Sequence, residues 1–216
     1  APNVAKFCES HFLLERAGPM AMLKGAVSAV LPLSYYDHPV LRKQAKAVSK
    51  ITPALRELAE QMMVAVRHHD GIGLAAPQVG QSVRLIVLDL PRPEPGKGLP
   101  PATPGELSLL PRMPMALFNP RLSDFSLQTG SRSEGCLSIP KVYADVVRPD
   151  FVQLTAETLS GDTVSFRCGG LLSRCLQHEV DHLDGILFID RLTPTALAAI
   201  TDDLERARKQ YRRARS

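Results

Sequence analysis

The sequence predicts an α+β domain in which small antiparallel or mixed sheets pack around a central helix, with another helix on its N-terminal side and one at the C-terminal end. Residues 151–158 and 163–166 alternate apolar and polar side chains around Ser160-Gly161-Asp162, which is typical of an antiparallel hairpin. Helical spacing falls in separate segments and does not alternate with the strands, which disfavours βαβ units. These two observations together predict the α+β class.

The composition is that of a globular protein. The 216-residue chain is 44% hydrophobic and 22% charged, and it is long enough to bury a sizeable core. Its longest apolar stretches, 25–33 and 85–88, fall far short of the roughly 20 residues that cross a bilayer, so we expect no membrane partner. We expect no disulfides among the four cysteines, because a chain of this length needs no covalent staples and no convincing secretory signal precedes them.

The formal net charge of +4 is unevenly distributed along the chain. Residues 206–216 contain six basic and no acidic residues, so the other 205 positions hold 26 − 6 = 20 basic residues against 22 acidic ones, a net charge of −2. We therefore expect a slightly acidic body followed by a basic tail, and no DNA-binding surface on the body.

Residues 1–30 have no sustained hydrophobic period, and we expect them to form an extension outside the folded domain. The first clear helix begins at Thr52, an N-cap residue followed by Pro53. Its apolar face consists of Leu55, Leu58, Met62 and Val66. His68 and His69 are adjacent at its end and point to different sides, so we expect them to be solvated and not to bind a metal.

A glycine-bounded loop is predicted over 71–80, followed by strands over 83–90 and 115–118. Between these strands, residues 91–114 contain eight of the 18 prolines, which predicts a surface loop without helix or central strand.

The central helix is predicted from Leu171 to Leu183, with Gly185 as its C-cap. The last helix is predicted over about 195–213, after Thr193-Pro194, and becomes basic along its length.

The central helix contains the pattern His-Glu-x-x-His. His178 and His182 are four residues apart and lie one above the other on one face, so both imidazoles can bind a single metal ion. Glu179 is turned about 100° away on the helix and can reach a water molecule at the metal without ligating the ion. The alternative is a pair of surface histidines beside an ordinary acidic residue.

A third ligand is needed, and its identity decides the class of enzyme. The extended zinc-peptidase pattern would have a histidine where this chain has Phe188, which cannot ligate. Glu205 has a permissible separation for a peptidase that takes a later glutamate, but it lies at the edge of the basic tail. Cys136 is the better candidate, because the neighbouring Gly135 allows close backbone approach and a Cys-His-His set leaves a tetrahedral position open for water.

Three segments, 71–80, 134–140 and 177–185, resemble the three signature motifs of the peptide deformylase family, in the same order. The resemblance extends from about residue 31 to residue 192. We therefore expect a catalytic domain over 31–195 that contains the proline-rich loop 91–114, with the extension 1–30 before it and the basic helix 196–216 after it.

The resemblance implies a hydrolase that removes the formyl group from the N-terminal methionine of nascent chains and releases formate. By motif position it makes Cys136, His178 and His182 the ligands of one divalent metal ion per chain, and Glu179 the general base and acid. It implies Fe²⁺ in vivo, with Zn²⁺, Ni²⁺ or Co²⁺ possible in purified protein, whereas the ligand set alone would indicate zinc.

The resemblance also assigns the groups that bind the substrate. It makes the side chain of Gln78 and the backbone N–H of Leu137 the donors to the developing oxyanion. Substrate contacts are expected from the main chain of Ile72, Gly73 and Gly135, since glycine admits a neighbouring strand closely, and from a methionine pocket that includes Leu171 and Cys175. The alternative for Leu171 is an ordinary place in the hydrophobic core.

Cys175 has a second interpretation. It lies three residues before His178 and seven before His182, on the same helical face, and could be a fourth ligand. A site closed in this way would be structural and inert.

Two other functions compete with deformylation: a zincin-type metallopeptidase, and an inactive ribosome-associated metal-binding module. The basic helix 196–216 is a candidate contact for ribosomal RNA. Because the Ile139-Pro140 version of the second motif resembles bacterial sequences, we expect a bacterial cytoplasmic protein, with an organelle of bacterial descent as the alternative.

Overall fold

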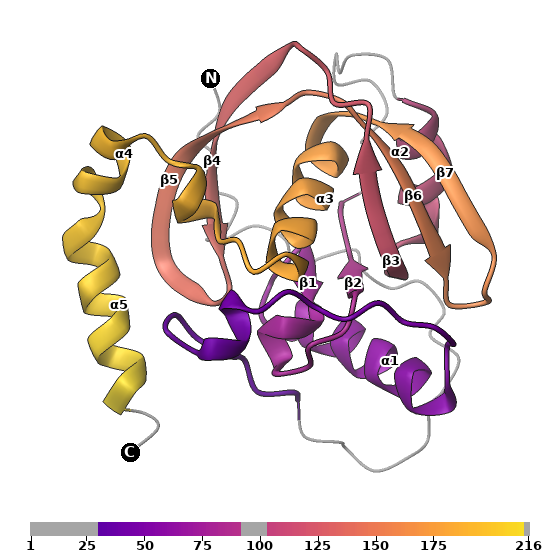
Figure 1. The fold of residues 1–216 in the computed structure, drawn as a ribbon, viewed down its shortest axis with the longest axis horizontal. Coiled ribbons are helices and arrows are strands. Elements are labelled where there is room, and N and C mark those ends of the chain that lie inside the picture. The colour runs from indigo at the N-terminus through magenta and orange to yellow at the C-terminus, as the bar shows by residue number, and fades with distance from the viewer. Residues whose placement is uncertain (1–29, 92–102, 214–216) are drawn as a thin grey trace.

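The computed structural model describes residues 30–91 and 103–213, so residues 1–29 of the predicted extension lie outside the described residues. Within these ranges the chain forms helices and two antiparallel sheets, and the predicted α+β class is confirmed (Figure 1). No helix in the described part of the chain is long and apolar enough to cross a bilayer.

The larger sheet has five strands in the order β1-β2-β3-β6-β7, and every neighbouring pair is antiparallel. The predicted hairpin is present as β6 and β7. The strands are β1 (Gly73–Ala75), β2 (Leu85–Leu88), β3 (Met115–Ser123), β6 (Val152–Thr158) and β7 (Thr163–Cys168). The smaller sheet pairs β4 (Thr129–Cys136) with β5 (Ile139–Pro149).

The helices are α1 (Pro53–His68), α2 (Pro104–Leu109), α3 (Gly170–Leu183), α4 (Pro194–Ala199) and α5 (Thr201–Arg213). The short 3₁₀ helices are η2 (Pro39–Arg42), η3 (Ala76–Val79), η4 (Leu110–Arg112) and η5 (Phe188–Arg191). The helix predicted from Thr52 is α1, and the Thr52 side chain caps it by accepting a hydrogen bond from the N–H of Leu55.

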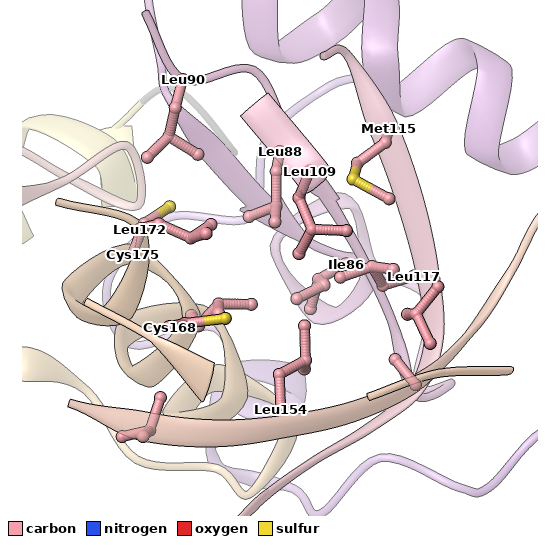
Figure 2. Packing of buried hydrophobic residues seen from close by; sticks show 14 of the residues in the cluster. Ile86, Leu88, Leu90, Leu109, Met115, Leu117, Leu154, Cys168, Leu172 and Cys175 are labelled. Carbon is pink, nitrogen blue, oxygen red and sulfur yellow. The ribbon is translucent and has the colours of Figure 1, made fainter. Parts of the chain in front are cut away.

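Helices cover both faces of the larger sheet. Because side chains alternate along a strand, Ile86 and Leu88 of β2 pack on the α3 side, while Leu85 and Val87 pack with α1. Figure 2 shows the first of these layers, where Leu172 of α3 lies across the core from the strands. In Figure 1, α3 lies between the larger sheet and the β4–β5 pair, and α5 packs beside β5. The helix with the His-Glu-x-x-His pattern is therefore enclosed by both sheets.

The predicted loop over 91–114 is wrong in its second half, because α2 and η4 lie there. Thr103 caps α2 and forms a capping box with Glu106, and Pro104 occupies the first turn, where its missing N–H costs nothing. Pro104 therefore begins this helix and does not prevent it. Residues 92–102 lie outside the described residues.

The single helix predicted over 195–213 is also wrong, because it is divided into α4 and α5 at Ile200. Ile200 has φ −109° and ψ 4°, outside the helical region, and its side chain is buried in the same cluster as Leu204 and Ala207 of α5. Burial of these apolar side chains therefore accompanies the break in the helix.

Candidate metal centre

Three ligand atoms converge from two elements of the structure. Cys136 ends β4, while His178 and His182 lie one turn apart on α3. Their ligand atoms all lie within 4.8 Å of one another, and the distance from Cys136 Sγ to His182 Nε2 is 3.2 Å. In the described part of the chain no other group of His, Cys, Asp and Glu side chains meets the same criterion. The structure thus brings together the three residues that the sequence predicts as ligands.

The donor set fits a divalent transition metal. His178 Nδ1 lies 3.0 Å from Glu134 Oε2, which leaves Nε2 of that ring for the metal. Burial holds the pKa of His182 well below its usual value, so its imidazole is neutral and able to ligate. One thiolate and two imidazoles leave one position of a tetrahedron open.

Glu134 is the centre of a hydrogen-bond network that supports the site. Arg148 donates two hydrogen bonds to its carboxylate, at 2.7 and 3.0 Å, and Arg174 donates a third at 2.7 Å. Arg148 also donates to Asp181 of α3 at 2.8 Å, so one buried guanidinium joins β5 to both β4 and the metal helix. These contacts fix the ring of His178 and the position of α3 relative to Cys136.

The ionisation of Glu134 follows from this environment. Burial by itself would raise its pKa, but the hydrogen bonds from His178 and Arg148 outweigh burial and lower the pKa to about 2. Neither Glu134 nor Arg148 is among the site residues predicted from the sequence. A signal for Glu134 was available, because it lies two residues before Cys136 and so faces the same side of a strand.

Glu179 has the surroundings of a proton acceptor. It is 4% exposed, and burial raises its pKa to about 7, with the charge of His178 acting in the opposite direction. Its Oε2 atom is buried and has no hydrogen-bond partner among the described residues. A Cβ at Gly73 would clash with Glu179 Oε1 and lie 2.7 Å from Cys175 Sγ, so only glycine leaves room for this carboxylate.

Gln78 is held with its amide nitrogen toward the site. It is 1% exposed, its Oε1 accepts from the N–H of Ala75 at 2.8 Å, and its Nε2 donates to Ser138 Oγ at 3.3 Å and lies 3.5 Å from Cys136 Sγ. Leu137 occupies the turn directly after Cys136. The role of its N–H as an oxyanion donor stays a prediction.

The remaining predicted substrate residues lie on β1, β4 and α3 or next to them. Gly73 lies on β1, an edge strand of the larger sheet, and Gly135 lies on β4, next to the ligand Cys136. Ile72 and Leu171 are 37% and 42% exposed, so both can meet a molecule from solvent. Cys175 is buried, and its Sγ lies 3.7 Å from the carbonyl of Ile72.

The competing metal ligands do not reach the site. Cys175 is outside the group of converging donors, which disfavours a closed fourth position. Glu205 is exposed on α5 and pairs with Arg208. His68 is exposed and His69 half-buried at the end of α1, and neither joins the ligand group.

We expect Cys175→Ala to retain one metal ion per chain and to keep turnover within about tenfold of the parent protein, because the substitution removes a pocket wall and no ligand. Metal content and turnover of the purified variant measure this directly. Cys136→Ala is the matched comparison and should lose metal. Loss of metal from Cys175→Ala would instead show that Cys175 closes the site.

The fold and this site define a metal-dependent hydrolase, since a three-ligand metal position beside a buried, unpartnered carboxylate is suited to activating water. A sequence model of the polypeptide deformylase family matches residues 30–197. The chain belongs to that family.

Individual relatives agree with the family assignment. Peptide deformylase 2 of Gloeobacter violaceus is 44% identical over 153 residues, 71% of this chain and 74% of the relative. The chloroplastic/mitochondrial peptide deformylase 1B of Arabidopsis thaliana is 37% identical over 181 residues, 84% of this chain and 61% of the relative. The crystal structure of a Synechococcus elongatus peptide deformylase, solved with actinonin, has a TM-score of 0.70 and 37% identity and covers 88% of this chain and 93% of that chain.

Proposed function

We propose that this protein removes the N-formyl group from the N-terminal methionine of nascent polypeptides and releases formate, with Cys136, His178 and His182 holding the metal. The reaction class is that of its family, the peptide deformylases, which are metal-dependent hydrolases. The single observation that supports these residue roles is the convergence of the three ligand atoms within 4.8 Å beside the buried carboxylate of Glu179.

The proposed metal is one divalent ion per chain, Fe²⁺ in the cell, with Zn²⁺, Ni²⁺ or Co²⁺ as substitutes in purified protein. Thiolate and imidazole ligands suit all four ions. A bound ion at this position supplies Lewis-acid activation of water and of the formyl oxygen.

Glu179 then acts as general base and general acid. Its buried carboxylate, with a pKa of about 7 and an unpartnered Oε2, can take the proton of the attacking water and return it to the leaving amine. Negative charge develops on the formyl oxygen during attack, and the Gln78 amide and the Leu137 N–H are the proposed donors to it, each worth about 3 kcal/mol. Gln78 is preorganised for this role, because Ala75 and Ser138 fix both ends of its amide.

The substrate is proposed to lie as an extended peptide between two strand edges. The main chain at Gly73 of β1 and at Gly135 of β4 would pair with it, and β-strand addition of this kind needs glycine where chains approach closely. The methionine side chain would enter the pocket flanked by Leu171 and Cys175.

A formyl-Met-Ala-Ser assay that detects formate tests the proposal with protein freshly loaded with Fe²⁺ or Ni²⁺. We expect release of formate that stops after chelation and returns when metal is restored. An unformylated peptide with internal bonds is the matched substrate, and its cleavage would indicate a zincin-type peptidase. A metal-loaded protein that releases no formate and cleaves no peptide would indicate the inactive binding module.

We further propose that α5 contacts the ribosome in a bacterial cytoplasm, or in an organelle of bacterial descent. Lys209 is exposed on α5, whereas Arg206 forms an ion pair with Asp203. Truncation would remove the buried Ala207, so the double substitution Arg206→Gln/Lys209→Gln is the better test. We expect it to weaken salt-sensitive sedimentation with ribosomes and to leave turnover of free peptide unchanged. Sedimentation equal to that of the parent protein would contradict the contact.

A further inference from the structure

A second pocket lies beside α3, away from the metal ligands. It has a volume of about 600 Å³ and is open to solvent, and α3 contributes Gln177, Val180, Asp181 and Asp184 to it. On a helical wheel with 100° per residue, the mean direction of these four positions is roughly 130° away from the mean direction of the two histidine ligands. The pocket is therefore distinct from the substrate site.

The lining of this pocket carries excess positive charge. Guanidinium groups reach it from four separate elements: Arg84 before β2, Arg121 on β3, Arg148 on β5 and Arg191 on η5. Asp181 and Asp184 of the lining, together with Glu134, which is hydrogen-bonded to Arg148, oppose these four arginines, so four positive and three negative charges leave a net charge of +1. Bringing these guanidinium groups close together costs electrostatic free energy, and a bound anion would lower that cost.

The carboxylates do not use all of the donors. Arg191 donates two bonds to Asp181, and Arg84 donates one to Asp184 at 2.6 Å, so each guanidinium, with five N–H groups, keeps further donors. Arg121 is exposed, and its side chain has no hydrogen bond or ion pair with any residue that the structure describes. Arg121 is therefore the group best placed to receive an oxyanion.

The lining of the pocket also contains apolar side chains. Phe125 and Val147 are 51% and 57% exposed, and the lining also includes the half-buried Leu122. A pocket with a few charged donors and an exposed apolar wall matches a ligand with an anionic group on an apolar body.

We propose that this pocket binds a small organic oxyanion, a carboxylate or a phosphate monoester, with its charge on Arg121 and its neighbours and its apolar body against Phe125 and Val147. Arg148 and Arg191 both line the pocket and both donate to Asp181 of α3. The ligand would therefore bind next to residues that hold the helix with two of the metal ligands. The proposal concerns binding at this second pocket and does not depend on the identity of the metal or of the deformylation substrate.

The chain contains no tryptophan, which makes a local reporter available. In the metal-loaded protein, Phe125→Trp places a single indole at the pocket, and its fluorescence is titrated with phenyl phosphate, benzoate and the uncharged benzyl alcohol. We expect a saturable change with at least one of the two anions, at a Kd of about 1 mM or tighter, and none with benzyl alcohol. A response to one anion and not the other identifies which source of oxyanion the pocket selects.

Arg121→Gln, added to the reporter variant, should weaken binding about tenfold or more, because a charge-assisted donor is lost. Arg132→Gln is the matched control, since Arg132 is an exposed arginine on β4 that does not line the pocket. Circular dichroism verifies that both variants are folded, which their exposed positions lead us to expect. Lack of a saturable response to either anion, equal binding of benzyl alcohol, or binding that Arg121→Gln leaves unchanged would each overturn the proposal.

Discussion

Replacing Glu179 by glutamine is expected to lower turnover of formyl-Met-Ala-Ser by about 10²- to 10⁴-fold while the protein retains its metal. Glutamine has nearly the same shape but cannot accept and return a proton. The carboxylate is not one of the three converging ligands, so its loss leaves the Cys-His-His set intact. Metal content and formate release, measured on the same preparation, check the two halves of this expectation.

Glu60→Gln is the matched control for this substitution. Glu60 is exposed on α1, so the same change of charge at that position should leave turnover unchanged. Near-normal turnover of Glu179→Gln would remove Glu179 from its proposed role. Loss of metal from this variant would instead indicate that Glu179 supports the ligands.

Arg148→Met is expected to lower the free energy of unfolding by about 3–5 kcal/mol, because it leaves the carboxylates of Glu134 and Asp181 buried without their common partner. The Arg148 side chain is 4% exposed, so its bonds to the two carboxylates are largely shielded from bulk water in the parent protein. Arg174 and His178 still contact Glu134, so this carboxylate does not lose all of its partners. Denaturant unfolding of the parent and variant proteins measures the difference.

The pH dependence of this difference has a definite sign. The pKa of Glu134 is about 2 in the folded protein and 4.5 ordinarily, so the native state binds fewer protons and Glu134 adds stability above about pH 5 that is lost as the pH falls toward 2. Without Arg148 its pKa moves back toward the ordinary value. The stability difference between parent and variant should therefore be largest above about pH 5 and shrink in acid.

Arg132→Met serves as the control for both measurements. Arg132 is exposed on the neighbouring β4, and we expect its removal to change stability by less than about 0.5 kcal/mol. If Arg148→Met were as stable as Arg132→Met at neutral pH, the buried network would not stabilise the fold, and Glu134 would orient His178 without help from Arg148.

Several features were predictable because they depend on neighbours in the chain. The Thr52-Pro53 start of α1 and the hairpin of β6 and β7 follow from capping and from alternation over a few residues. The pairing of His178 with His182 likewise follows from helical geometry alone. The capping box at Thr103 and Glu106 is equally local, although the prolines around it favour the prediction of a loop.

The strands β4 and β5 were not predictable in this way. β4 reads Thr-Gly-Ser-Arg-Ser-Glu-Gly-Cys, a polar run without the apolar alternation that marks a strand. It exists because it pairs with β5 along its whole length and because its last residues contact α3 through Glu134 and Cys136.

The sequence by itself determined the class of the fold and the types of the metal ligands, since spacing within one helix and three short motifs carry that information. Only the tertiary structure decided how Glu134, Arg148 and Asp181 join β4, β5 and α3, and that Cys175 lies outside the ligand group. The physical reason is that a buried ion pair between distant residues leaves no period in the sequence. Its partners are selected by which side chains the packed sheets exclude from water.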